Sequence, residues 1–114
     1  MATRLVVAKP FSVCLAAFRF LESNDQKLRP VIIIGRPHGR RYVQMAIPIS
    51  SSTQAEAVDV VLEDWKGNGL LKPSVARIHR LSAILEQDLI EEIGMIDDKH
   101  RQVIKSALKN LLDV

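Results

Sequence analysis

Strand-like apolar runs that begin or end beside a cation or a hydroxyl constrain the fold of this chain most strongly. Val31–Ile34 contains one valine and three isoleucines, and it follows directly on Arg29-Pro30. Such β-branched residues suit a pleated, packed surface, and a proline biases the residue before it towards an extended conformation. A second run closes with Pro48-Ile49-Ser50-Ser51, and a third tract is Leu71-Lys72-Pro73-Ser74. We therefore expect strands that hold cations and hydroxyls at their ends.

The first 62 residues contain most of the expected strands, because short apolar runs alternate there with polar or Gly- and Pro-containing segments. The expected strands are Arg4–Ala8, Val13–Phe20, Pro30–Ile34, Arg41–Ile47 and Val58–Leu62. The segments expected between them are a hairpin loop at Leu21–Leu28, a turn at Gly35–Arg40, and a loop or short helical turn at Ser50–Ala57.

The second half begins with a turn and ends with a helix. Trp65–Gly69 contains Asn68-Gly69, a pair that favours positive φ, and Pro73–Leu81 is expected to continue as one long strand of imperfect alternation. Asp97 is a good N-cap for a final helix, and Asp98 adds negative charge to its first turn. One face of that helix is apolar, with Val103, Ile104, Ala107, Leu108, Leu111 and Leu112.

Size and composition indicate one globular domain, residues 1–114. The chain has 114 residues, 47% of them hydrophobic and 25% charged, which is ordinary for a globular protein. Its single cysteine, Cys14, excludes an internal disulfide framework, fits a reducing compartment and is expected to be a core residue. The longest apolar run, Val13–Phe18, is far shorter than the roughly 20 residues of a membrane-spanning helix. We therefore expect a cytoplasmic protein without a membrane partner.

Charge is distributed unevenly along the chain. Residues 1–57 hold eight Lys/Arg and three Asp/Glu, a balance of +5, whereas residues 58–114 hold eight and ten, a balance of −2. A basic sheet surface attracts a polyanion such as RNA and speeds the encounter. The alternative is ordinary solvated surface charge.

Four stretches, in order, resemble the MazF/PemK (Kid) family of toxins from toxin–antitoxin pairs. The likeness runs from about Phe11 to Leu112. Phe18-Arg19-Phe20 is similar to the family's Phe-Pro-Phe, and Lys27–Ile34 is similar to its basic-Arg-Pro-aliphatic strand. Pro48-Ile49-Ser50-Ser51 is similar to its Pro-Ile-Thr-Ser. The fourth stretch is Leu71–Leu81, followed by Ile93-Gly94 and the last helix, and it is similar to the family's C-terminal half.

The resemblance implies a mainly β fold with α, a small SH3-like antiparallel barrel closed by a C-terminal helix. For Ser82–Met95, whose pattern alone also fits a helix, it implies a short helical turn near Glu86–Leu89 and then a strand. It further implies a homodimeric endoribonuclease that cleaves single-stranded RNA without a metal or other cofactor, and an antitoxin protein partner. That antitoxin's acidic, disordered tail would compete with RNA for the basic groove.

The expected catalytic residues are Arg29 and Ser50. Cleavage of RNA without a metal requires removal of the 2′-hydroxyl proton, protonation of the leaving 5′-oxygen and fixed donors for the phosphate charge. A guanidinium matches two phosphate oxygens at once, and the resemblance assigns this role to Arg29. Ser50 stands where the family has a catalytic Thr, and it keeps the hydroxyl but loses the methyl group that limits rotamers. The alternatives are a surface Arg29 paired with Asp25 or Glu22, and a plain serine-rich turn.

Further residues near these strands are candidates for binding RNA: Lys72, Ser74 and Arg77 because they resemble the family's Lys-Pro-Ser-x-x-Arg stretch, and the cations Lys27, Arg36, Arg40 and Arg41 with ordinary solvated charge as the alternative. Ser51 is a further candidate. Arg77 has a further alternative, an ion pair with Glu63 or Asp64. The three histidines show no metal-ligand spacing, and His79 is a secondary candidate for proton transfer.

The chain also departs from the family pattern. Phe11-Ser12 replaces Gly-Asp, Arg19 replaces the middle Pro of Phe-Pro-Phe, and Ser50 replaces Thr. Because these changes fall in the N-terminal loop and the active groove, a second hypothesis is a module of the same fold that binds nucleic acid or antitoxin with weakened catalysis. A third is a structural or regulatory dimer.

Overall fold

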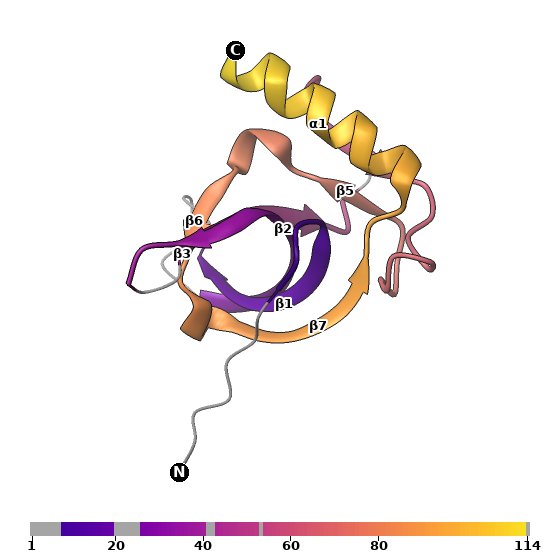
Figure 1. Cartoon of the computed structure of the whole chain (residues 1–114). Coiled ribbons are helices and arrows are strands. Elements are labelled where there is room, and N and C mark those ends of the chain that lie inside the picture. The colour runs from indigo at the N-terminus through magenta and orange to yellow at the C-terminus, as the bar shows by residue number, and fades with distance from the viewer. Residues whose placement is uncertain (1–7, 20–25, 41–42, 53, 114) are drawn as a thin grey trace.

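A seven-stranded antiparallel sheet curls into a barrel-like ring, and one helix lies across its side (Figure 1). The computed structural model describes residues 8–19, 26–40, 43–52 and 54–113. The elements are β1 (Ser12–Arg19), β2 (Gln26–His38), β3 (Val43–Ser50), β4 (Val60–Leu62), β5 (Ser74–Ala76), the 3-10 turn η1 (Ile78–Arg80), β6 (Ser82–Ile84), the 3-10 turn η2 (Glu86–Asp88), β7 (Leu89–Met95) and α1 (Asp98–Leu112).

The strand order is β4-β5-β3-β2-β1-β7, and β6 pairs with β3 beside this path. Within the described residues the hydrogen-bonded path does not return from β7 to β4, so the ring is an incomplete barrel. The mainly β fold with a C-terminal helix is confirmed. No helix in the described ranges combines the length and apolar content needed to cross a membrane.

Strand β2 is buried on both faces, which explains its unbroken apolar run. Ile32 packs with Val13 and Ile47 in a cluster that also includes Ile104 of α1. Its neighbour Ile33 packs on the other face of the strand, in a cluster with Cys14, Val31, Ala46 and Ile84. Each fully buried aliphatic side chain of this size contributes about 1.5–3 kcal/mol.

Cys14 is fully buried, as expected of a core residue. Burial and then the negative charge of Glu92 raise the pKa of its thiol to about 11. Because the thiolate is the reactive form, this cysteine is unreactive at neutral pH.

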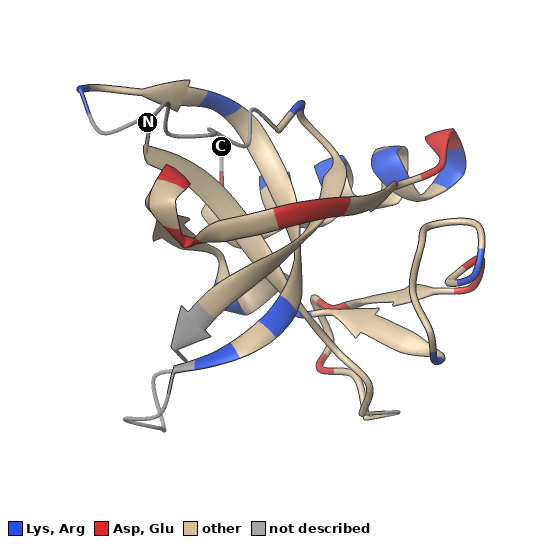
Figure 2. Cartoon of the chain, turned by 90° about the horizontal axis from the view of Figure 1, so that it is seen from below, with Lys and Arg blue, Asp and Glu red and all other residues tan. Residues whose placement is uncertain are grey.

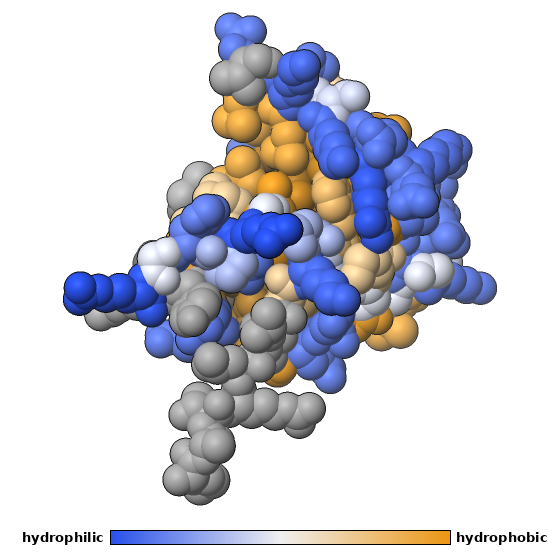
Figure 3. All heavy atoms as spheres, in the orientation of Figure 1, coloured by the Kyte–Doolittle hydropathy of each residue, from blue (hydrophilic) through white to orange (hydrophobic). Residues whose placement is uncertain are grey.

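The expected final helix is confirmed, including its start. The Asp97 carboxylate accepts the backbone N–H of His100 at 3.3 Å and so caps α1. Ile104 is fully buried, and Ala107, Leu108 and Leu111 pack partly against the same core. Val103 and Leu112, also expected on the apolar face, are instead exposed. Figure 3 shows apolar side chains gathered between α1 and the sheet.

Strand β2 is longer than the sequence indicated. The segment expected as a turn at Gly35–Arg40 is wrong up to His38, because β2 continues through an irregularity in its pairing with β3 between Ile34 and His38. Gly35 lies at that irregularity and has φ +71°, a backbone conformation that residues with a side chain rarely adopt. The turn itself comes at residues 39–40.

The single long strand expected over Pro73–Leu81 is also wrong. β5 ends at Ala76, the Arg77 N–H donates to the Pro48 carbonyl at 2.9 Å, and η1 follows with hydrogen bonds back to Arg77 and Ile78. Val75, Ala76 and Ile78 are all buried, so consecutive residues of this segment face the core, which explains the imperfect alternation. This bend turns the chain between β5 and β6.

The remaining local expectations have mixed outcomes. The turn over Trp65–Gly69 is confirmed, as are the helical turn and strand expected within Ser82–Met95. The expected strand Arg4–Ala8 lies outside the described residues except for Ala8, which is in no strand. Residues 20–25 and 41–42, on which parts of the expected strands and hairpin loop fall, also lie outside them. The loop expected over Leu21–Leu28 is wrong from Gln26 on, because β2 begins there.

Phe11 replaces the glycine of the family pattern, and its backbone keeps the conformation that glycine favours. Its φ is +68°, in the left-handed region, and its N–H donates to the Ile33 carbonyl at 2.6 Å. The ring lies under two cations of α1, with centroid distances of 5.6 Å for Arg101 and 5.7 Å for Lys105. The Phe11 ring thus contacts α1, while the left-handed backbone conformation of Phe11 costs roughly 1–2 kcal/mol.

Candidate functional site

The end of β3 lies at a fork in the sheet. Strand β3 pairs with β2 as far as Val31↔Pro48, and beyond that point its residue Ser50 pairs with Val75 of β5. Arg29 precedes Val31 by two residues, and Ser50 follows Pro48 by two. The structure therefore brings the backbones of Arg29 and Ser50 to the same end of the sheet.

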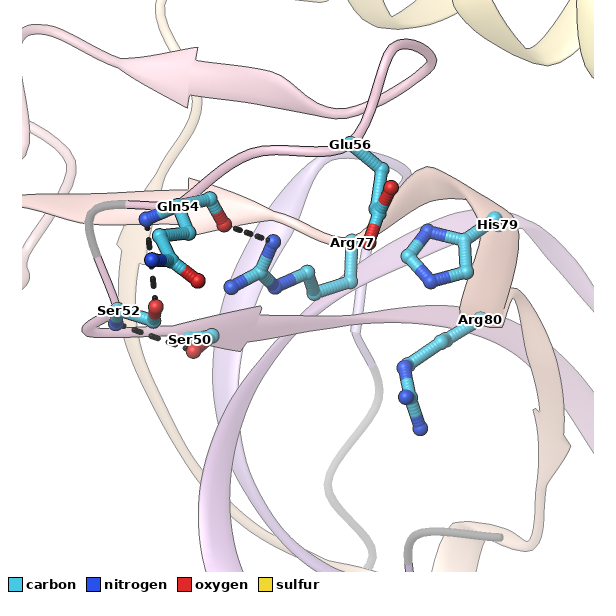
Figure 4. A pocket seen from close by; sticks show the side chains of 7 residues that line it. All are labelled: Ser50, Ser52, Gln54, Glu56, Arg77, His79 and Arg80. Carbon is cyan, nitrogen blue, oxygen red and sulfur yellow. Dashed lines mark hydrogen bonds between the residues drawn. The ribbon is translucent and has the colours of Figure 1, made fainter. Parts of the chain in front are cut away.

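One cavity at this fork, which we name the Arg77 cavity, has a volume of about 300 Å³ (Figure 4). Its lining residues are Ser50, Ser52, Gln54, Glu56, Arg77, His79 and Arg80. The Ser52 N–H donates to Ser50 Oγ at 3.1 Å, and the Gln54 N–H donates to Ser52 Oγ at 3.3 Å. These two turns fix the serine hydroxyls at the rim, as Ser side chains commonly do in loops.

Behind this lining lies a carboxylate that is not among the residues selected from the sequence. The Asp59 side chain is fully buried, at 0% exposure, and forms ion pairs with Arg77 Nη1 at 2.9 Å and His79 Nδ1 at 2.8 Å. It also accepts the Glu56 N–H at 3.0 Å, while Arg77 Nη1 donates to the Gln54 carbonyl. The proposed pairing of Arg77 with Glu63 or Asp64 was therefore wrong.

Asp59 is held as an anion. Burial acts to raise the pKa of its carboxyl, but hydrogen bonds from Arg77, His79 and the Glu56 N–H lower the pKa below its ordinary value of 3.8. One signal in the sequence could have found this residue: Asp59 stands between Val58 and Val60, inside an expected strand. A carboxylate in such a run is either at the surface or paired in the interior.

The second cavity at the fork, which we name the Arg29 cavity, has a volume of about 220 Å³ and a mostly apolar lining. Its polar members are Arg29, Ser51, Lys72 and Ser74. Ser74 is buried, and its hydroxyl donates to the Lys72 carbonyl at 2.7 Å. Arg29 is partly buried, whereas Ser51 and Lys72 are exposed.

The candidate residues lie at several places, two of which are the cavities at the fork. Arg29, Ser51, Lys72 and Ser74 share one cavity, and Ser50 and Arg77 share the other. Lys27 is exposed on β2, two residues before Arg29. Arg36 lines a separate shallow hollow with Lys9, and Arg40 follows the far end of β2. Seven residues of strand separate Arg36 from Arg29, roughly 23 Å at the usual rise.

Charges of opposite sign follow different strands. Figure 2 shows basic residues along β2 next to the grey segment, and acidic residues along β7, which leads into α1. Within the described ranges, no cluster of three or more His, Cys, Asp or Glu side chains is arranged to hold a metal ion. The groups available at the fork are guanidinium, ammonium, hydroxyl, imidazole and carboxylate groups, and the cations and hydroxyls among them are of the kind that binds a phosphodiester.

Comparisons with known proteins agree with this architecture. Residues 9–112 match the model of the PemK-like, MazF-like toxins of type II toxin–antitoxin systems. The structure superposes on the Mycobacterium tuberculosis toxin MazF-mt6 with a TM-score of 0.72 and 26% identity, covering 90% of this chain and 97% of that one.

Two further solved structures share the fold at lower identity. The MazE-MazF structure from Deinococcus radiodurans gives a TM-score of 0.74 at 15% identity, covering 96% of this chain and 98% of that one. A mycobacterial endoribonuclease in complex with its cognate antitoxin gives 0.68 at 13% identity, covering 91% and 93%. No protein in the curated set that was compared matches this chain. The match over residues 9–112 shows that the chain belongs to the PemK-like, MazF-like toxin family of type II toxin–antitoxin systems.

Proposed function

We propose that this protein is an endoribonuclease that cleaves single-stranded RNA by attack of a ribose 2′-hydroxyl on the adjacent phosphate, without a metal ion. The observation that carries the proposal is the fork at the end of β3, where two cavities present cations and hydroxyls side by side. Membership in a family of toxins supports the same activity. The name of a structural neighbour, a mycobacterial endoribonuclease, agrees with it.

Each proposed role follows from the chemistry of the side chain. Arg29, partly buried on a strand, stabilises the negative charge that develops on the phosphate. Ser50, whose hydroxyl is already oriented by the Ser52 N–H, orients or protonates a reacting oxygen. Lys72, Ser51 and Ser74 at the Arg29 cavity, and Arg77 at the other cavity, position the phosphates. Lys27, Arg36 and Arg40 extend the RNA contacts along β2.

Purified protein incubated with single-stranded RNA in excess chelator tests the proposal. We expect discrete products with 2′,3′-cyclic phosphate and 5′-hydroxyl ends, and a loss of about 10²–10³-fold in rate for Arg29→Ala. Lys109→Ala, an exposed cation on α1, is the matched control and should cleave like the wild type. Equal product formation by wild type and Arg29→Ala would reject the assigned mechanism.

The proposal includes two protein partners and a compartment. We expect a cytoplasmic homodimer and an antitoxin whose acidic tail folds onto the basic groove, because such a tail competes electrostatically with RNA. The names of two structural neighbours, which are complexes with an antitoxin, agree with such a partner. Light scattering measures the dimer. Co-purification with the product of the neighbouring reading frame, and its release by salt, test the antitoxin.

A second candidate function is a binding module with weakened catalysis. The observation that favours it is the separation of side chains at the fork: Ser50 lines one cavity and Arg29 the other, although their backbones are close. A salt titration of RNA affinity discriminates between the two. Salt-dependent binding with RNA left intact supports the module, and RNA turnover supports the enzyme.

A further inference from the structure

The His79 imidazole lies at the fork, where a hydrogen bond fixes its orientation. It lies in η1, its side chain is 33% exposed, and it lines the Arg77 cavity together with Ser50 and Arg80 (Figure 4). Its Nδ1 lies 2.8 Å from Asp59 Oδ1. An ionised carboxylate only accepts hydrogen bonds, so Nδ1 carries the proton. In the neutral ring, Nε2 therefore has the lone pair.

We infer that His79 is the general base of this site, and that Asp59 positions it. The inference rests on the proposed RNA cleavage and assigns one step of it. A base needs a lone pair at a substrate-accessible atom and a ring fixed in one tautomer. The hydrogen bond from Nδ1 to a buried carboxylate supplies the tautomer, and the partial exposure of the ring supplies the access.

Asp59 is itself immobilised from three sides. One carboxylate oxygen accepts from Arg77 Nη1 and from the Glu56 N–H, and the other faces His79 Nδ1. The side chain has no exposed surface. Rotation of Asp59 would break the ion pair with Arg77, so the imidazole is oriented before substrate arrives. Pre-organised groups of this kind avoid the cost of rearrangement during the reaction.

The step balances as a transesterification. Nε2 of His79 accepts the proton of the 2′-hydroxyl, and the 2′-oxygen forms a bond to phosphorus. The bond from phosphorus to the 5′-oxygen breaks, and that oxygen leaves with a proton from water. The products are a 2′,3′-cyclic phosphate and a 5′-hydroxyl, and the imidazolium then returns its proton to solvent. The guanidinium groups meet the phosphate charge, and Asp59 stabilises the transient imidazolium.

The test compares His79→Ala with His38→Ala, since His38 is an exposed histidine of β2 that does not line the Arg77 cavity. We expect His79→Ala to lower kcat by about 10²-fold or more, the usual contribution of a general base, and His38→Ala to leave it unchanged. Added imidazole should restore part of the His79→Ala rate, in proportion to its neutral fraction. Asp59→Asn should lower kcat less than His79→Ala does, with KM little changed.

The pH–rate profile gives a second readout. The wild-type rate should rise with pH, as expected of a step that needs a general base, and this ascending limb should be absent in His79→Ala. The charged groups that share the cavity or contact the ring are Glu56, Asp59, Arg77 and Arg80.

Two results would overturn the assignment while leaving the proposed function intact. One is a His79→Ala protein that cleaves RNA at the wild-type rate. The other is a slow His79→Ala protein that keeps the ascending limb and does not respond to imidazole, which would make His79 a structural residue. Failure of the wild type itself to cleave RNA would instead reject the proposed function.

Discussion

The two cavities at the end of β3 differ in how their charged groups are held. In the Arg77 cavity, Arg77 and His79 share the fully buried Asp59 carboxylate, and the serine hydroxyls accept backbone N–H groups. The Arg29 cavity has apolar walls contributed by Leu15, Ile49 and Ile93, and its Lys72 is exposed to solvent. Among the described residues that line it, none is acidic.

This difference indicates a division of roles. A rigid, hydrogen-bonded set of groups is suited to a chemical step, because its geometry is fixed in advance. An apolar cavity with cations at its rim is suited to holding a nucleobase and its phosphate, because apolar walls accept any base and the charge attracts the backbone. We therefore propose that proton transfer belongs to the Arg77 side and substrate binding to the Arg29 side, where Arg29 itself also stabilises the charge that develops on the phosphate.

The largest expected effect is on the free energy of unfolding, and it should differ between variants of the two cavities. Arg77→Ala leaves the buried Asp59 carboxylate without its guanidinium partner, and loss of one member of a buried ion pair costs about 3–5 kcal/mol. We expect denaturant unfolding to show a loss of about 3 kcal/mol for Arg77→Ala. Lys72→Ala, in the Arg29 cavity, should change stability by less than about 0.5 kcal/mol. Similar values for the two variants would break the comparison.

The adjacent serines provide an activity test of the same division. Ser50 lines the Arg77 cavity and Ser51 the Arg29 cavity. We expect Ser50→Ala to lower kcat about tenfold, the value of one hydrogen bond of about 1.4 kcal/mol. Ser51→Ala should mainly raise KM. Ser50→Thr should raise kcat, because the added methyl group limits the rotamers of the hydroxyl. A larger kcat effect at Ser51 would reverse the assignment.

The stability of the protein in acid should depend on Asp59. Its folded pKa lies below 3.8, so its stabilising contribution is fully present above the unfolded pKa and is lost as pH falls through the folded pKa. Each unit of difference is worth about 1.4 kcal/mol. We expect wild type to lose stability relative to Asp59→Asn as pH falls below about 4. Asp97→Asn should show the same sign, since burial is again outweighed by hydrogen bonds, here from His100, that lower the Asp97 pKa. Equal acid sensitivity of wild type and Asp59→Asn would exclude the ion pair as a source of stability.

The sequence indicated the elements well where local chemistry determines them. The cap at Asp97, the turn at Asn68-Gly69 and the strand over the apolar run Val31–Ile34 depend on residues close in sequence, and the structure has each of them. The end of β5 was missed because it depends on a hydrogen bond from Arg77 to Pro48, nearly 30 residues away. No local pattern encodes such a contact.

The site was indicated by residue type but not by arrangement. Arg29 and Ser50 do meet at one end of the sheet, yet adjacent residues of an extended chain point to opposite sides, so Ser50 and Ser51 line different cavities. Asp59 was overlooked because its role depends on two partners 18 and 20 residues further along the chain. The pairing of a buried acid is a property of the fold.

The smallest expected effect concerns Lys72, which tests whether the Arg29 side acts through charge. An exposed cation that contacts one phosphate contributes mainly by counterion release, so its loss weakens RNA binding most at low salt. We expect Lys72→Ala to reduce the slope of log K against log salt concentration by about 0.7, the value of one contact to single-stranded RNA, with kcat unchanged. Lys109→Ala on α1 controls for net charge alone. An equal change in slope for both variants would mean that the Arg29 side attracts RNA only through the overall charge of the protein. The only difference between the two cavities would then be the paired set of Asp59, Arg77 and His79.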